Sequence, residues 1–105
     1  MTELAILLPT YNEEENIEVV LSETLKTFET VDCEILIVDG NSTDKTKEIA
    51  NRFAKIYNNV KIIEYPERGK AKAIAHVIQM LDSNYVIMYD VDQSYSIYDA
   101  FKVYQ

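Results

Sequence analysis

Four short apolar segments alternate with three amphipathic segments along this chain of 105 residues, and this alternation constrains the fold most. Continuous apolar runs are typical of strands buried on both faces, and apolar residues at helical spacing are typical of helices that cover a sheet. We therefore predict an α/β fold, with a Rossmann-like parallel sheet of about four strands and helices on both faces. The predicted strands are 4–8, 34–39, 60–65 and 85–90, and the predicted helices are 13–28, 43–57 and 69–81.

Local signals give the expected ends and inner faces of these elements. Pro9 is expected to close the first strand. Asn12 is expected to cap the first helix, with Glu15 in the capping-box position. The helical spacing places Ile56 or Tyr57, and further along Ile78, on the inner faces of the second and third helices.

Composition favours one ordered domain, since the chain is 48% hydrophobic and contains only two Gly and two Pro. The single Cys33 has no internal disulfide partner, and we interpret it as a small buried apolar side chain in a reducing, cytoplasmic setting. No apolar run approaches the roughly 18 residues of a membrane span, and the first residues lack the pattern of a signal peptide.

Charge is distributed unevenly along the chain. The formal net charge of −8 argues against general nucleic-acid binding, which needs a basic surface. Residues 45–72 nevertheless carry eight Lys or Arg against three Glu. This basic stretch has two interpretations, either solvated helix faces or a surface that meets a phosphate-bearing ligand.

Polar residues gather where the predicted strands end, which is where open parallel sheets bind ligands. Asp90 and Asp92 are two residues apart in an extended segment, so both carboxylates point to one side. They are either surface charges or ligands for Mg²⁺ or Mn²⁺. Asp39 either contacts a nucleoside or caps the following helix. Lys70 lies in the first turn of the third predicted helix, where a phosphate is favoured, and Tyr11 is the tyrosine expected to contact a ligand.

Four segments in this order resemble the N-terminal half of family-2 glycosyltransferases of the GT-A fold. These segments are LLPTYNEEENI (7–17), ILIVDGNSTDKT (35–46), RGKAKAI (68–74) and VIMYDVDQS (86–94). Within that family the chain is most similar to the polyprenyl (dolichol) phosphate sugar transferases, such as the mannose synthases. The resemblance extends over nearly the whole chain.

The resemblance implies a site for a nucleoside-diphosphate sugar, such as GDP-mannose or a UDP-sugar, with Mg²⁺ or Mn²⁺ on the diphosphate. A polyprenyl phosphate is the implied acceptor. The implied metal ligands are Asp90 and Asp92, and Ser94 is expected near the metal and the sugar. The implied nucleotide-binding residues are Pro9, Tyr11, Glu13, Val38, Asp39, Gly40, Lys70, Asp90 and Val91. No catalytic base is identified.

The chain departs from the family pattern at three places. Gly40 stands where many members have a second acid, and the sequence from Ser94 to Ser96 replaces a segment that usually contains Pro. The chain also stops at Gln105, so we expect one nucleotide-sugar-binding domain over 1–105 without the acceptor half.

These observations leave two functions open. One is sugar transfer by a protein that is cytoplasmic or peripheral to the cytoplasmic face of a membrane. The other is a nucleotide-sugar-binding module that is inactive until a partner subunit supplies the other half. Homo-oligomerisation is also expected, because a short sheet leaves one edge strand exposed.

Overall fold

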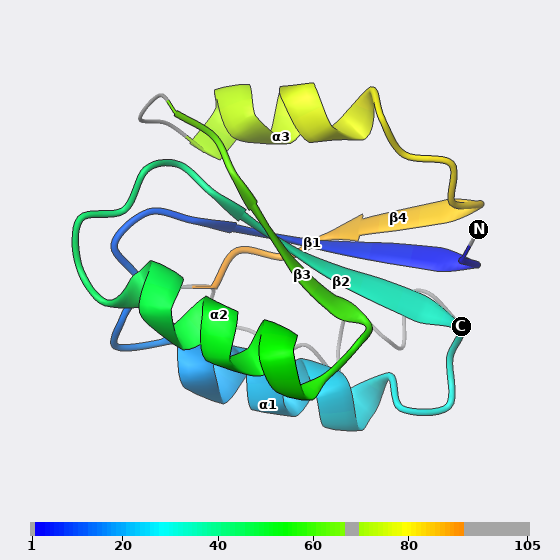
Figure 1. The fold of residues 1–105 in the computed structure, drawn as a ribbon. Helices are drawn as coiled ribbons and strands as arrows, with labels where there is room; N and C mark the ends of the chain where they lie inside the picture. The colour runs from blue at the N-terminus through cyan, green and yellow to red at the C-terminus, as the bar shows by residue number, and fades with distance from the viewer. Residues whose placement is uncertain (1, 67–69, 92–105) are drawn as a thin grey trace.

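The computed structural model describes residues 2–66 and 70–91. It contains one four-stranded parallel sheet in the order β3-β2-β1-β4 (Figure 1). The predicted α/β fold with a parallel sheet is therefore confirmed. The strands are β1 (Leu4–Thr10), β2 (Cys33–Asp39), β3 (Val60–Glu64) and β4 (Tyr85–Met88), and the helices are α1 (Ile17–Thr27), α2 (Thr46–Ile56) and α3 (Lys70–Ile78).

Helices cover both faces of the sheet, as the continuous apolar strands require. Figure 1 shows α1 and α2 on one face and α3 on the other. Alternate residues of each strand point to opposite faces, so the core has two parts. On the α1/α2 face Ile6, Ile35 and Phe28 are among the buried residues, and on the α3 face Leu7, Leu36 and Val77 are. No helix in the described part of the chain is long and apolar enough to cross a bilayer.

The first strand is longer than predicted, because Pro9 lies inside β1 and pairs in register with Val38 of β2. Proline has no backbone N–H and so donates no hydrogen bond to a neighbouring strand. The effect of Pro9 on the sheet therefore depends on whether its backbone faces β2 or β4. The Leu7 carbonyl accepts a hydrogen bond from Tyr89 N–H at 3.0 Å, so Leu7 and Pro9 both face β4. The paired register with β4 ends at Leu7. Pro9 therefore costs no bond to β2 and ends only the pairing with β4.

The start of the first helix differs from the prediction. The helix begins at Ile17 with Asn16 at the N-cap, and in the described part of the chain Asn16 makes no side-chain capping bond. Asn12 is not the cap. Its φ of 52° lies in the left-handed region, which is incompatible with the N-cap geometry that the capping-box prediction needs. The physical reason is tertiary, since the Asn12 side chain bonds the loop after β2.

The predicted inner-face residues at the ends of α2 and α3 are exposed. Ile56, the last residue of α2, is 72% exposed. Its alternative Tyr57 is 41% exposed, although its ring stacks on Phe53 with centroids 6.0 Å apart. Ile78 ends α3 and is 50% exposed. The predicted burial of Cys33 is confirmed, since this residue is buried at the start of β2.

Candidate functional site

The carboxyl ends of β1, β2 and β4 lie together at one edge of the sheet. Thr10, the last residue of β1, pairs in register with Asp39, the last residue of β2. On the other side of β1, Tyr89 N–H bonds the Leu7 carbonyl, so Asp90 follows directly at the same edge. The topology therefore brings together three of the loops in which the sequence predicted site residues.

The Asp39 carboxylate is fully buried and accepts three hydrogen bonds. Its Oδ1 accepts from the Thr10 hydroxyl at 2.7 Å and from the Ser42 hydroxyl at 2.6 Å. Its Oδ2 accepts from Ser42 N–H at 2.8 Å. A buried carboxylate is tolerated when donors surround it in this way. Asp39 thus ties the ends of β1 and β2 to the loop that follows β2.

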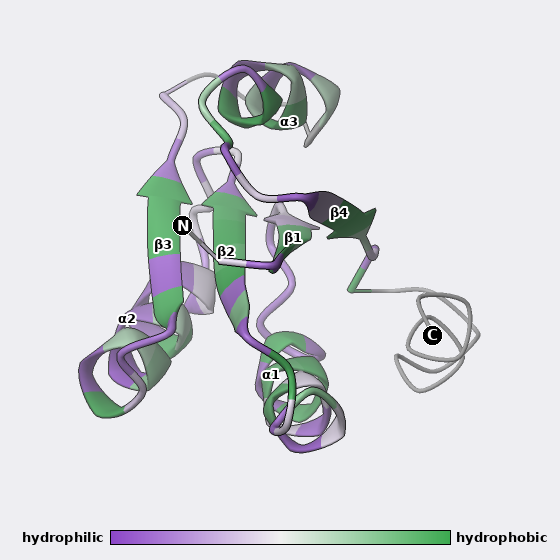
Figure 2. Ribbon diagram, turned by 90° about the vertical axis from the view of Figure 1, so that its right-hand side faces the viewer, coloured by the Kyte–Doolittle hydropathy of each residue, from purple (hydrophilic) through white to green (hydrophobic). Residues whose placement is uncertain are grey.

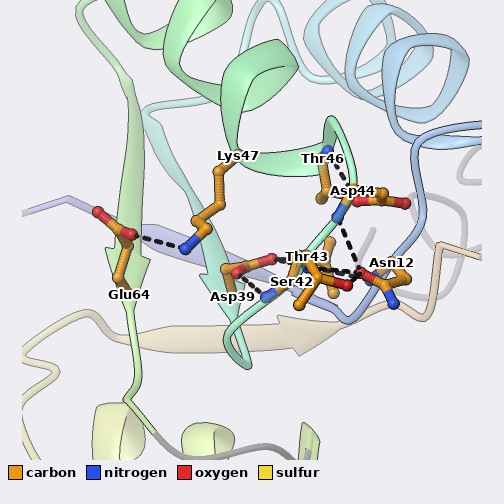
Figure 3. Close-up of polar contacts among 9 residues, drawn as sticks. Asn12, Asp39, Ser42, Thr43, Asp44, Thr46, Lys47 and Glu64 are labelled. Atoms are coloured by element: carbon orange, nitrogen blue, oxygen red, sulfur yellow. Dashed lines mark hydrogen bonds and ion pairs between the residues drawn. The ribbon is translucent and has the colours of Figure 1, made fainter.

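Asn12 makes the second link between these loops (Figure 3). Its N–H donates to the Ser42 hydroxyl oxygen at 2.9 Å. Its Oδ1 accepts from Thr43 N–H at 2.8 Å and from Asp44 N–H at 3.3 Å. Asn is among the residues that tolerate a positive φ, which was the available sequence signal for this role. The sequence analysis missed it, because a local capping interpretation also fitted.

A third link joins Glu13 to the start of α2. Glu13 N–H donates to the Thr46 hydroxyl oxygen at 2.8 Å, and that hydroxyl donates to Asp44 Oδ1. Asp44 also accepts from Thr46 N–H at 2.9 Å and from Glu14 N–H at 3.3 Å. Burial acts to raise the pKa of Asp44, but the hydrogen bonds from Thr46 and from the backbone outweigh it and hold the pKa below its ordinary value.

These links fix the backbone around Tyr11 and Glu13, two of the predicted nucleotide-binding residues. Tyr11 is half-buried and Glu13 is buried, and they flank Asn12 in the loop after β1. Gly40 is buried and donates its N–H to the Thr10 carbonyl at 2.9 Å. Because Gly40 has no side chain, this position presents only backbone groups to a ligand and lacks the second acidic side chain that the sequence pattern often has here.

A groove opens on the α3 face of the same edge. It has a volume of about 420 Å³ and includes Pro9 and Asp90, so it joins two predicted site residues across β1 and β4. Asp90 is half-buried there. The rest of the lining is apolar and comes from α3 and β4: Ala71, Ile74, Ala75, Ile78 and Met88.

The remaining predicted site residues lie in the core or outside the described residues. Val38 is fully buried under α3, and Val91 is buried on the α1/α2 face. Only their backbone is therefore available to a ligand. Lys70 is the first residue of α3. Asp92 and Ser94 fall outside the described residues.

One predicted metal ligand, Asp90, lies at this edge in the described part of the chain. Asp90 supplies carboxylate oxygens, the ligands that Mg²⁺ and Mn²⁺ prefer, and these ions complete their shell with substrate phosphates. Within residues 2–66 and 70–91 no three His, Cys, Asp or Glu side chains form a cluster that could hold a metal. The pairing of Asp90 with Asp92 stays a prediction.

Sequence comparison relates the chain to one family. The family model described as glycosyl transferase family 2 matches residues 5–104. Dolichyl-phosphate beta-glucosyltransferase ALG5A of Trichomonas vaginalis is 37% identical over 95% of this chain and 33% of its own length. Glycosyltransferase AglE of Haloferax volcanii is 40% identical over 67% of this chain and 24% of its own length. The chain therefore spans a third or less of the length of these relatives.

Structural comparison gives similar neighbours. The mannosyltransferase PcManGT from Pyrobaculum calidifontis, solved in complex with GDP-Man and Mn²⁺, matches with a TM-score of 0.79 and 27% identity, over 95% of this chain and 30% of that one. TarS 1–349 from S. aureus, solved in complex with UDP-GlcNAc, matches with a TM-score of 0.77 and 23% identity, over 97% of this chain and 30% of that one. The second likeness concerns the fold alone.

Proposed function

This chain belongs to glycosyltransferase family 2, and on that premise we propose that it binds a nucleoside-diphosphate sugar at the carboxyl edge of its sheet. One observation carries the proposal: Pro9 and Asp90 line one groove, while the loop with Tyr11 and Glu13 is bonded to the loop after β2. The family resemblance implied these residues as a set, and their common position at one edge of the sheet supports the proposal.

In this proposal the rigid loops hold the nucleoside. Tyr11 and Glu13 contact the base or ribose, supported by the bonds from Asn12 and Thr46 that fix their backbone. Asp39 acts through Thr10 and Ser42, because its two oxygens already accept three hydrogen bonds. A direct contact between Asp39 and the nucleoside stays a prediction that competes with this one.

Asp90 and Asp92 are the residues proposed to hold Mg²⁺ or Mn²⁺, together with the diphosphate of the donor. A bound ion of this kind neutralises the negative charge that develops on the departing diphosphate. Lys70, at the start of α3, is proposed to add positive charge near the phosphates. The Mn²⁺ in the complex of the Pyrobaculum neighbour supports the choice of metal.

The proposed acceptor is a polyprenyl phosphate, because one relative is described as a dolichyl-phosphate glucosyltransferase. The phosphate oxyanion of such an acceptor is itself a nucleophile, so the reaction needs little help from a protein base. The acceptor also implies that transfer takes place at a membrane surface, with the protein peripheral to its cytoplasmic face.

Calorimetry tests donor binding. We expect GDP-mannose, UDP-glucose or UDP-GlcNAc to bind in the presence of Mn²⁺, and binding to weaken at least tenfold without the ion. Asp92→Ala should weaken binding by a similar factor. Asp82→Asn is the control and should bind as the unmodified chain does, because Asp82 is an exposed residue that precedes the amino end of β4. Binding to none of the three donors, or equal binding by Asp92→Ala, contradicts the proposal.

A second function is a nucleotide-sugar-binding module without turnover, because the candidate residues in the described part of the chain are all proposed to bind the donor and none is proposed as a catalytic base. Both functions predict metal-dependent donor binding. Only the first predicts transfer of radiolabelled sugar to a polyprenyl phosphate by the 105-residue chain, so a product assay separates them.

A further inference from the structure

Three polar side chains form a row across the carboxyl edge of the sheet, on the face that α1 and α2 cover. They belong to Thr10, Asp39 and Glu64, the last residues of β1, β2 and β3. Thr10 pairs in register with Asp39, and Asp39 pairs in register with Glu64. Each lies two positions after an apolar residue that packs on the α1/α2 face, so each side chain points to that face as well. The row therefore extends the candidate site from β1 to β3.

Exposure distinguishes Glu64 from the other two members of the row. Thr10 and Asp39 are fully buried, and the Asp39 carboxylate already accepts three hydrogen bonds. The Glu64 side chain is 59% exposed. Its Oε1 lies 3.5 Å from Nζ of Lys47, whose side chain is 33% exposed (Figure 3). The pair of Lys47 and Glu64 is thus the part of this row that an incoming molecule can reach.

The first turn of α2 places Lys47 over this edge. Helix α2 begins at Thr46, whose hydroxyl oxygen accepts from Glu13 N–H, and Lys47 is the next residue. Figure 2 shows α2 beside β3, on the face of the sheet opposite to α3. The bond to Glu13 therefore joins the loop that is proposed to hold the nucleoside to the helix that carries Lys47.

The ion pair retains most of its capacity for further hydrogen bonds. A Lys amino group donates several hydrogen bonds and a carboxylate accepts several, so a single contact leaves both groups able to bind more. At 3.5 Å the contact is also loose, and a partly exposed pair of this kind stabilises a fold only slightly. Lys47 and Glu64 together present a donor beside two acceptor oxygens.

This pattern of donor and acceptors matches one nucleobase. The hydrogen-bonding edge of guanine carries the O6 acceptor, the N1–H donor and the N2–H donor in that order. Lys47 can donate to O6 while the two Glu64 oxygens accept from N1–H and N2–H. Uracil has the carbonyl O2 where guanine has its amino group, and this oxygen would face the carboxylate. Adenine and cytosine have an amino group where guanine has O6, and this group would face Lys47.

The strand order leaves room for such a contact. Under the proposed function, the diphosphate lies at Asp90 after β4 and the nucleoside lies at Tyr11 after β1. The order β3-β2-β1-β4 puts Glu64 and Asp90 on opposite sides of β1. Strands are about 4.8 Å apart, so the backbone of Glu64 lies roughly 10 Å from that of Thr10, a span comparable to the length of a nucleoside. The base then points away from β4 and toward β3.

We propose that Lys47 and Glu64 bind the base of the donor nucleotide and select guanine over uracil. Lys47 donates to O6, and Glu64 accepts from N1–H and N2–H. The donor class is therefore a GDP-sugar. This inference rests on the proposed function, since it assigns the base of the donor which that function requires.

Calorimetry of the whole chain with GDP, UDP and inosine diphosphate, each with Mn²⁺, tests the proposal. Inosine diphosphate differs from GDP only in lacking the 2-amino group. We expect GDP to bind at least about tenfold more tightly than either of the others. Glu64→Gln should lose this preference, because an amide presents one acceptor in place of two. The variant should bind GDP and inosine diphosphate with affinities that agree within about threefold.

Glu34→Gln is the matched control. Glu34 also belongs to an ion pair, with Lys61 at 3.1 Å, but it lies near the amino end of β2. This variant should keep the preference for GDP. If Glu64→Gln does not fold, the comparison of GDP with inosine diphosphate on the unmodified chain still decides whether the 2-amino group is bound.

Two kinds of result would overturn the proposal, and they have different meanings. Equal binding of the three nucleotides, tighter binding of UDP, or a preference for GDP that Glu64→Gln retains would refute the selection of guanine and leave donor binding intact. Binding of none of the three nucleotides would contradict the proposed function and this inference with it.

Discussion

The Asn12 side chain accepts a hydrogen bond from Thr43 N–H at 2.8 Å and so joins two loops separated by 31 positions in the sequence. Asn12 also donates its own N–H to Ser42, whose hydroxyl and N–H bond Asp39. Because these contacts run from the loop after β1 to the end of β2, they set the geometry of the candidate site before any ligand binds (Figure 3).

We expect Asn12→Ala to lower the free energy of unfolding by about 1–2 kcal/mol, because Ala loses the side-chain acceptor and is strained at positive φ. Asn16→Ala is the control, since Asn16 occupies the N-cap without a side-chain capping bond. It should cost less than about 0.5 kcal/mol. Urea denaturation measures both, and equal losses would show that the link between the loops is dispensable.

Asp39→Asn should destabilise the protein by about 3 kcal/mol, because an amide cannot accept all three bonds that the buried carboxylate accepts. A double-mutant cycle with Ser42→Ala should give a coupling of about 0.5–3 kcal/mol. If Asp39 also contacts the nucleoside, the variant will lose nucleotide affinity by a larger factor than Ser42→Ala does, in addition to its loss of stability. Denaturation and calorimetry on the same samples distinguish the two roles.

The lowered pKa of Asp44 predicts a pH dependence at the start of α2. A carboxyl group with a folded-state pKa below its unfolded value of about 3.9 adds stability above that pH, and this is lost as pH falls through the folded pKa. Thr46→Val removes a donor to Asp44 and should raise the pKa measured by NMR. Thr43→Val removes a hydroxyl that bonds Asn12 instead, and should leave the pKa of Asp44 unchanged.

Cys33 should react slowly with thiol reagents in the folded protein. Burial raises its pKa, with a further rise from the charge of Asp32, and its Sγ donates to the Phe28 carbonyl at 3.9 Å. At pH 8 we expect labelling by iodoacetamide to be at least about 100-fold faster in denaturant, because unfolding exposes the thiol and restores its ordinary pKa of about 8.5.

The same pKa shift has a consequence for stability. A thiol whose folded-state pKa is raised favours the folded state until pH rises past the unfolded value of about 8.5, and the contribution is lost through the folded pKa. Asp32→Asn should lower the pKa of Cys33 and speed labelling modestly. Labelling of the folded chain at the denatured rate would contradict the buried position.

Much of the fold was predictable from the sequence, because burial leaves a periodic trace. The strands around Ile6 and Ile35 contain continuous apolar runs, and each helix carries its inner face at helical spacing. Pattern therefore determined the number, type and order of the elements. It also indicated that polar residues would meet at the carboxyl edge, since that follows from parallel strands alone.

The tertiary structure decided which polar group bonds which. Asn12, Asp39 and Ser42 each had a plausible local partner in the sequence, but their actual partners depend on how two loops align across β1 and β2. Exposure was likewise undetermined, because Val86 and Ile78 fit the pattern of core residues and yet lie beside an edge that α3 does not cover. Periodicity reports that a residue is apolar on one face, whereas only the assembled sheet determines whether a neighbour covers that face.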